Sequence, residues 1–189
     1  MTVSDISRMF VSPHGGWDEL ARIHPSVIKL FMFLVLPFSL VPPAMIEYAG
    51  LHYGSRLLPG ADAGSWAVSA AVFFVAELFT VPLMAWAIRS NATTQKINVG
   101  YPEAFLVAAV AAIQMWLSAF GLFVPNPGFI ILVALAGLIG SIALVYHGIE
   151  AMLKLREEVE IASLTFTTLA MGVLGWTLLL VLVFMVLLL

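Results

Sequence analysis

The stretch Trp66 to Ile88, WAVSAAVFFVAELFTVPLMAWAI, decides how this chain folds. As an α-helix it is roughly 34 Å long, which is enough to cross the hydrocarbon core of a bilayer. Its only ionisable side chain, Glu77, lies near the middle. A carboxyl group exposed to hydrocarbon is costly, so we expect Glu77 to face the inside of a helix bundle. The stretch therefore predicts a spanning helix that is surrounded by other helices.

The composition agrees with a membrane protein. Of the 189 residues 62% are hydrophobic and only 10% are charged, whereas soluble domains carry about 25% charged residues. The net charge of −3 and the absence of a basic block argue against a nucleic-acid partner. There is no cysteine, which excludes disulfides and thiolate metal sites. We expect one membrane domain that has membrane lipids as its surroundings and no cofactor.

Five apolar segments predict an all-α, polytopic fold with five transmembrane helices. Their approximate bounds, which together make up a domain over 28–189, are 28–48, 66–88, 103–124, 128–149 and 167–189. Pro37, Pro42 and Pro43 predict that the first span is kinked or ends early. The turn VPNPG at 124–128 is short enough to make spans three and four an antiparallel hairpin. Residues 1–27 are expected to form one or two interfacial helices with Trp17 at headgroup depth, or else a disordered tail.

The basic residues predict the orientation. If there are five spans, all but one of the eight Lys and Arg residues flank them on the same side as the amino terminus, and Arg56 is the exception. Because cytoplasmic loops are enriched in Lys and Arg, the amino terminus is predicted to be cytoplasmic and the carboxy terminus outside.

Two further features concern packing and partners. Ala104, Ala108 and Ala112 form a seam of small residues, which we interpret as intrachain packing, with a homo-oligomer interface as the alternative. The charged run at 148–163, GIEAMLKLREEVEIAS, predicts that span four continues as a cytoplasmic or surface-bound helix. This helix is either a docking surface for a protein partner or a solvated linker. Its candidate docking residues are Lys154, Arg156, Glu157 and Glu158.

Three stretches carry a family resemblance. They are LVYHGIEAMLKL at 144–155, SLTFTTLAMGVLGW at 163–176 and SPHGGWDELARIHP at 12–25. With these stretches, five spans and short loops, the chain resembles the Yip (Ypt/Rab-interacting protein) family in its bacterial inner-membrane branch. The resemblance implies a five-helix membrane domain with a cytoplasmic amino terminus. Eukaryotic members are associated with Rab GTPases and vesicle traffic, and no catalytic residue carries over from the family.

The candidate intramembrane polar site is centred on Glu77. Gln114 lies about midway along the third segment, so two antiparallel neighbours would place both side chains at one depth. We predict a Glu77–Gln114 hydrogen bond with Thr80 or Ser118 about one turn away. Such a site is either a structural clamp that fixes helix register, or part of an ion path or ligand cavity.

Other polar residues predict little chemistry. His147 near the end of span four is interpreted as a packing or hydrogen-bonding residue, and Glu47 with His52 does not define a metal site. The HExxH, GxxxxGK and GxSxG patterns are absent, so no enzyme is expected.

Two functions follow from these observations. The first is a non-enzymatic scaffold or adaptor that docks a partner on its cytoplasmic face. The alternative is a small transporter, channel or lipid-handling protein with Glu77 at its working site.

Overall fold

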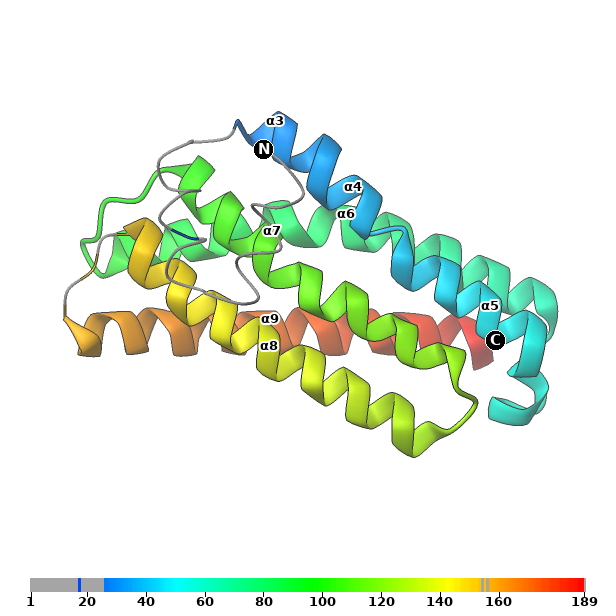
Figure 1. Cartoon of the computed structure of the whole chain (residues 1–189). Helices are drawn as coiled ribbons and strands as arrows, with labels where there is room; N and C mark the ends of the chain where they lie inside the picture. The colour runs from blue at the N-terminus through cyan, green and yellow to red at the C-terminus, as the bar shows by residue number, and fades with distance from the viewer. Residues whose placement is uncertain (1–16, 18–25, 154, 156, 189) are drawn as a thin grey trace.

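In the computed structural model, five long antiparallel helices lie side by side in a single bundle (Figure 1). The structure describes residues 17, 26–153, 155 and 157–188. Five helical segments are long and apolar enough to cross a membrane, which confirms the predicted fold class. They are Val27–Leu57, Ala63–Thr94, Tyr101–Phe123, Pro127–Leu153 and Glu158–Leu188. We call the two ends of the bundle the α5–α6 end and the α8–α9 end, after the connections found there.

The first span is interrupted where its prolines predict. It consists of α3 (Val27–Leu30), a π-helical turn (Phe31–Val35), α4 (Leu36–Phe38) and α5 (Val41–Leu57). The Leu36 amide donates to the carbonyl of Phe31, five residues earlier, immediately before Pro37. A proline has no amide hydrogen to continue the regular ladder, so the chain breaks and restarts. Pro42 then occupies the first turn of α5, where no partner is needed.

Helices α6 (Ala63–Thr94) and α7 (Tyr101–Ser118) form the centre of the bundle. Asp62 caps α6, because its carboxylate accepts hydrogen bonds from the Ser65 amide at 2.7 Å and the Ser65 hydroxyl at 2.9 Å. The two helices are also joined near the α8–α9 end, where the Tyr101 hydroxyl donates to the Pro82 carbonyl at 3.2 Å. A 3₁₀-helix, η2 (Ala119–Phe123), extends α7 towards the α5–α6 end.

Helices α7 and α8 (Pro127–Leu153) form the predicted hairpin. The Asn126 carboxamide oxygen accepts from the Phe129 amide at 3.1 Å and so caps the start of α8. Gly137 allows the close approach of the two helices, since a Cβ there would lie 2.9 Å from the Gln114 carbonyl oxygen. This contact supports the interpretation of the small residues as intrachain packing.

The charged run does not form the continuous helix that was predicted over 150–162. Helix α8 ends at Leu153, and α9 (Glu158–Leu188) begins well before the predicted start at residue 167. Glu158 and Glu160 lie in the first turn of α9, where negative charge is favourable near the positive end of the helix dipole. Ile161 and Leu164 are buried, so this first turn also packs against the bundle. The acidic residues thus begin the last span and do not extend the fourth.

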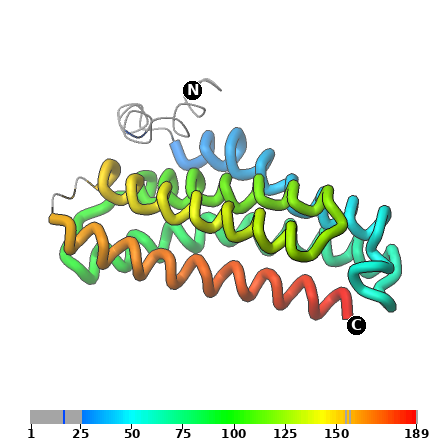
Figure 2. Tube along the Cα trace, turned by 60° about the horizontal axis from the view of Figure 1, so that its bottom comes forward, coloured from blue at the N-terminus to red at the C-terminus, as the bar shows by residue number. Residues whose placement is uncertain are grey.

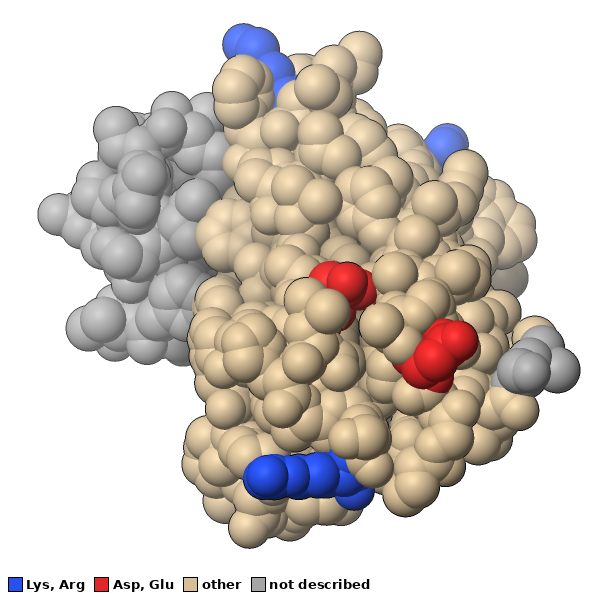
Figure 3. All heavy atoms as spheres, turned by 90° about the vertical axis from the view of Figure 1, so that its right-hand side faces the viewer, with Lys and Arg blue, Asp and Glu red and all other residues tan. Residues whose placement is uncertain are grey.

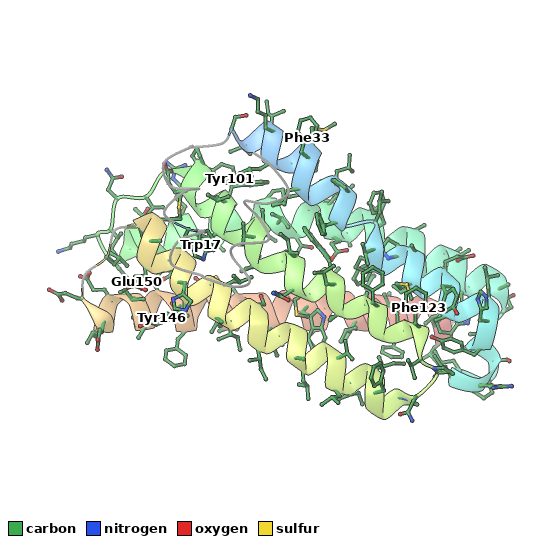
Figure 4. The ribbon with its side chains drawn as sticks, viewed as in Figure 1. Trp17, Phe33, Tyr101, Phe123, Tyr146 and Glu150 are labelled. Carbon is green, nitrogen blue, oxygen red and sulfur yellow. The ribbon has the colours of Figure 1, made fainter. Side chains whose placement is uncertain are left out.

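Trp17 is wholly buried at the α8–α9 end, and its predicted headgroup depth stays a prediction. A Cβ at Gly148 of α8 would lie 2.8 Å from the indole ring, so this glycine makes room for it beside Val107 of α7. Figure 4 shows Trp17 over the same part of the bundle as Tyr146 and Glu150 of α8. By contrast, Phe33 points outward from the first span. The rest of residues 1–25, predicted to be interfacial, lies outside the described part of the chain.

Candidate intramembrane polar site

A buried stripe on α6 carries Glu77 into the bundle. The side chains at three- and four-residue intervals along this face are all buried: Ala70, Phe73, Glu77, Val81 and Ala85. Residues so spaced share one face of an α-helix. Glu77 is only 7% exposed, so the prediction that this acid faces inward is confirmed.

The indole of Trp116 is the hydrogen-bond partner of Glu77. Its Nε1–H donates to Glu77 Oε1 at 2.5 Å, which joins α6 to α7 in the interior. The Trp116 ring is fully buried and stacks against Phe38 of the first span, with ring centroids 6.5 Å apart. The carboxyl group is therefore held through a side chain that three elements fix in place.

The predicted Glu77–Gln114 hydrogen bond is wrong. A Cβ at Gly140 of α8 would lie 3.2 Å from the Gln114 side chain, so Gln114 faces α8 and not α6. Residues 114 and 116 point about 200° apart around a helix with 3.6 residues per turn. Equal depth in the membrane correctly indicated which part of α7 lies level with Glu77. It did not determine which face of α7 contacts α6.

Two cavities meet at Glu77. The smaller one, of about 130 Å³, lies among α6, α7, α8 and α9 on the side towards the α8–α9 end. The larger one, of about 440 Å³, extends to the α5–α6 end, where Leu57, Trp66 and Leu187 line it. Glu77, Met115 and Trp176 line both cavities. The carboxyl group thus stands at the junction of two spaces inside the bundle.

One oxygen of this carboxyl group is unsatisfied. Glu77 Oε2 is buried and has no hydrogen-bond partner. The Thr168 hydroxyl of α9 is in the same condition: the residue is 2% exposed, its Oγ1 has no partner, and it lines the smaller cavity. Buried polar groups in hydrocarbon are normally paired, so two unpaired groups in one cavity indicate a place for a polar guest.

The other predicted members of the site are divided between the cavities. Thr80 lines the smaller cavity, and its hydroxyl donates to the Ala76 carbonyl at 3.0 Å. Ser118 lines the larger cavity, and its hydroxyl donates to the Met115 carbonyl at 2.7 Å. Both residues therefore border the space that reaches Glu77. Gln114 lines neither cavity.

Sequence reasoning missed three residues of this site. Trp116, Trp176 and Thr168 were not assigned to it from the sequence. The signal for Thr168 is present in the TFTT run at 165–168, because hydroxyl groups in a spanning segment must find partners. No comparable signal exists for Trp176, whose position between two cavities depends on the packing of five helices.

Two of the four candidate docking residues are described, and both lie at the α8–α9 end. Glu157 and Glu158 are exposed there, and the Glu157 carbonyl accepts from the amides of Glu160 and Ile161, each at 3.1 Å. Lys154 and Arg156 lie outside the described residues, so their role stays a prediction. On the last turns of α8, His147 Nδ1 lies 3.7 Å from the Glu150 carboxylate, an ion pair when the imidazole is protonated.

His52, which the sequence places near Glu47, makes its contacts within its own helix. His52 Nδ1 lies 2.9 Å from the Tyr48 carbonyl oxygen of its own helix, and its ring stacks on that of Tyr48 with centroids 4.0 Å apart. The imidazole is thus engaged within α5. In the described ranges there is no cluster of three or more His, Cys, Asp or Glu side chains suited to a metal ion.

Comparison with known protein families matches residues 7–179 to the model of the Yip1 domain. Comparisons with curated proteins and with solved structures return no match. The family match covers all but the ends of the chain, including the three stretches that carry the resemblance noted from the sequence, the first four spans and the larger part of the fifth.

Proposed function

Since the chain belongs to the Yip1 domain family of membrane proteins, we propose that it is a lipid-handling protein that binds an apolar ligand inside its helix bundle. The observation that carries this proposal is the pair of cavities that meet at Glu77. Ligand pockets typically have volumes of about 300–1,000 Å³, apolar walls and a few polar groups. The larger cavity, at about 440 Å³, has this character.

The walls of the larger cavity support an entry from the bilayer. Ile131 of α8 and Phe184 of α9 line it, although they are 60% and 48% exposed on the outside of the bundle. The rim between α8 and α9 is thus made of side chains that also face lipid. Figure 1 shows α8 inclined to α9, with the first turns of α8 pointing away from it. An apolar molecule would enter here without crossing water.

The proposed setting is the bacterial inner membrane with the amino terminus in the cytoplasm. In the described part of the chain, Lys29, Arg89 and Lys96 lie towards the α8–α9 end, and Arg56 lies at the other end. Figure 3 views the α5–α6 end, where charged atoms are sparse. The positive-inside rule places the α8–α9 end in the cytoplasm. We propose a non-enzymatic role.

A cavity-filling variant tests the proposal. Ala134 of α8 lines the larger cavity, whereas Ala136 is exposed on the same helix. The wild-type protein and the variants Ala134→Phe and Ala136→Phe are purified from membranes, and bound apolar molecules are extracted and identified by mass spectrometry. We expect the wild type and Ala136→Phe to retain an enriched ligand and Ala134→Phe to lose it. Equal retention in all three, or no enrichment in the wild type, would overturn the proposal.

The second candidate is a scaffold or adaptor that docks a protein partner on the cytoplasmic face. It is favoured by the exposed acids Glu157 and Glu158, which stand at the predicted cytoplasmic end. This function predicts that charge reversal at Lys154 and Arg156 abolishes crosslinking to a partner in the membrane, while Glu77→Gln leaves it intact. The lipid-handling function predicts the opposite pattern for ligand retention.

A further inference from the structure

The smaller cavity has the features of a head-group site. Glu77 Oε2 and Thr168 Oγ1 are buried and lack partners, and both residues belong to the wall of this cavity. Ser141 of α8 and Thr80 add two more hydroxyl groups. A volume of about 130 Å³ is too small for a chain-bearing ligand but is ample for a small polar group, since one water occupies about 30 Å³ of liquid.

The larger cavity has the features of a tail site. Along α6 it extends from Glu77 to Trp66, which corresponds to about 16 Å at 1.5 Å per residue. This is close to half of the roughly 30 Å hydrocarbon thickness of a bilayer. Its walls are almost wholly apolar, with Phe73, Trp66 and Leu180 among them. A single extended chain fits this length and this chemistry.

The charges around both cavities restrict the polar end of the ligand. Among the described residues that line them, Glu77 is the only ionisable one, and neither Lys nor Arg is present. A phosphate or carboxylate head would therefore meet a carboxyl group without any balancing cation, in surroundings that screen charge poorly. A group that donates hydrogen bonds would instead satisfy the free oxygens of Glu77 and Thr168.

We propose that the two cavities together bind one single-chain amphiphile whose polar end is a hydroxyl or an amine. The tail lies in the larger cavity, and the polar end passes Glu77 to donate hydrogen bonds in the smaller one. Trp176 lines both spaces and contacts the ligand where head and tail join. This inference rests on the proposed lipid-handling function and deepens it by naming the class of ligand.

A matched series of heads on one tail tests the inference. Dodecanol, dodecylamine and dodecanoate are added separately to the full chain in phospholipid nanodiscs, and bound ligand is counted by native mass spectrometry. We expect the alcohol and the amine to bind at least about tenfold more tightly than the carboxylate, because an ionised carboxylate head would be buried in this site without a balancing cation. Equal binding of all three would overturn the head-group assignment and leave the Ala134→Phe result untouched.

Variants locate the head within the protein. Thr168→Val removes the free hydroxyl and should weaken binding of dodecanol about fivefold, the value of one hydrogen bond. Thr177→Val is the matched control, since Thr177 is exposed, bonds to the Val173 carbonyl of its own helix and lines neither cavity. Unchanged binding in Thr168→Val, or an equal loss in both variants, would refute the placement of the head.

Glu77→Gln provides an independent readout. Because the amide keeps the shape and removes the carboxyl group, we expect the preference for amine over carboxylate to fall to near unity while dodecanol still binds. A preference that survives this change would contradict the role given to Glu77. If none of the three probes binds while Ala134→Phe still removes a native ligand, the ligand class is wrong and the lipid-handling function stands.

Discussion

The two halves of the bundle are packed differently along the same helices. In the half towards the α8–α9 end, Phe105 and Leu106 of α7 and Ile149 of α8 are almost completely buried, and the cavity on this side measures only about 130 Å³. In the half towards the α5–α6 end, the same helices surround about 440 Å³. Figure 2 shows that the chain nevertheless forms one continuous bundle. The difference indicates that one half serves mainly stability and the other holds the space for a guest.

Replacing the two tryptophans near Glu77, one tightly packed and one that borders both cavities, should give the largest contrast. Trp116 is 1% exposed, stacks on Phe38 and holds Glu77, whereas Trp176 is half-buried between the cavities. Trp116→Ala should lower the free energy of unfolding by about 3–5 kcal/mol. Trp176→Ala should cost clearly less, because its ring has fewer neighbours to lose. Denaturation in mixed micelles measures both values, and equal losses would remove the distinction between a tightly packed position and one that borders the cavities.

A methyl group added at two glycines compares the tight α7–α8 contact with the wall of the smaller cavity. At Gly137 a Cβ would lie 2.9 Å from the Gln114 carbonyl oxygen, while at Gly172 the nearest atom is Met84 Cε at 3.8 Å. Gly137→Ala should therefore destabilise the protein by about 1–3 kcal/mol through overpacking. Gly172→Ala, which faces the smaller cavity, should be close to neutral. The same denaturation assay measures both free energies of unfolding. An unchanged value for Gly137→Ala would show that α7 and α8 separate easily.

The smallest effect concerns the cap at the α5–α6 end and depends on pH. Hydrogen bonds from the Ser65 amide and hydroxyl lower the pKa of Asp62 below its ordinary value. The stabilisation is thus present above the unfolded-state pKa and is lost as the pH falls through the lower, folded-state pKa. Asp62→Asn keeps a capping side chain and should abolish this acid-dependent part. Asp62→Ala should also lower the melting temperature at neutral pH.

Melting curves between neutral and acidic pH check this prediction. The control is Asp18→Asn, which changes an equal charge elsewhere in the chain. A wild-type melting temperature that falls no more steeply in acid than that of Asp62→Asn would show that the cap contributes nothing.

The helices could be predicted from the sequence better than the contacts between them. Five spans and the inward face of Glu77 could be predicted, because hydrocarbon penalises both a short apolar segment and an unsheltered carboxyl group. The partner of Glu77 could not be predicted, because Gln114 and Trp116 share a depth and only helix rotation separates them. The start of α9 was misplaced because the acids around Glu158 resemble a loop until their position in a first helical turn is known. The cavities were invisible, since empty space depends on several helices at once.

The burial of Trp17 has a consequence for the order of assembly. Its ring rests against Gly148, which follows it by 131 positions in the chain, so the notch between α7 and α8 does not exist when Trp17 leaves the ribosome. At a synthesis rate of about 5–20 residues per second, Gly148 is synthesised roughly 7–26 s after Trp17. During that interval we expect the indole to lie at the interface of lipid and water, where tryptophan is enriched. Trp17 therefore reaches its buried position late, after the fourth helix has been synthesised.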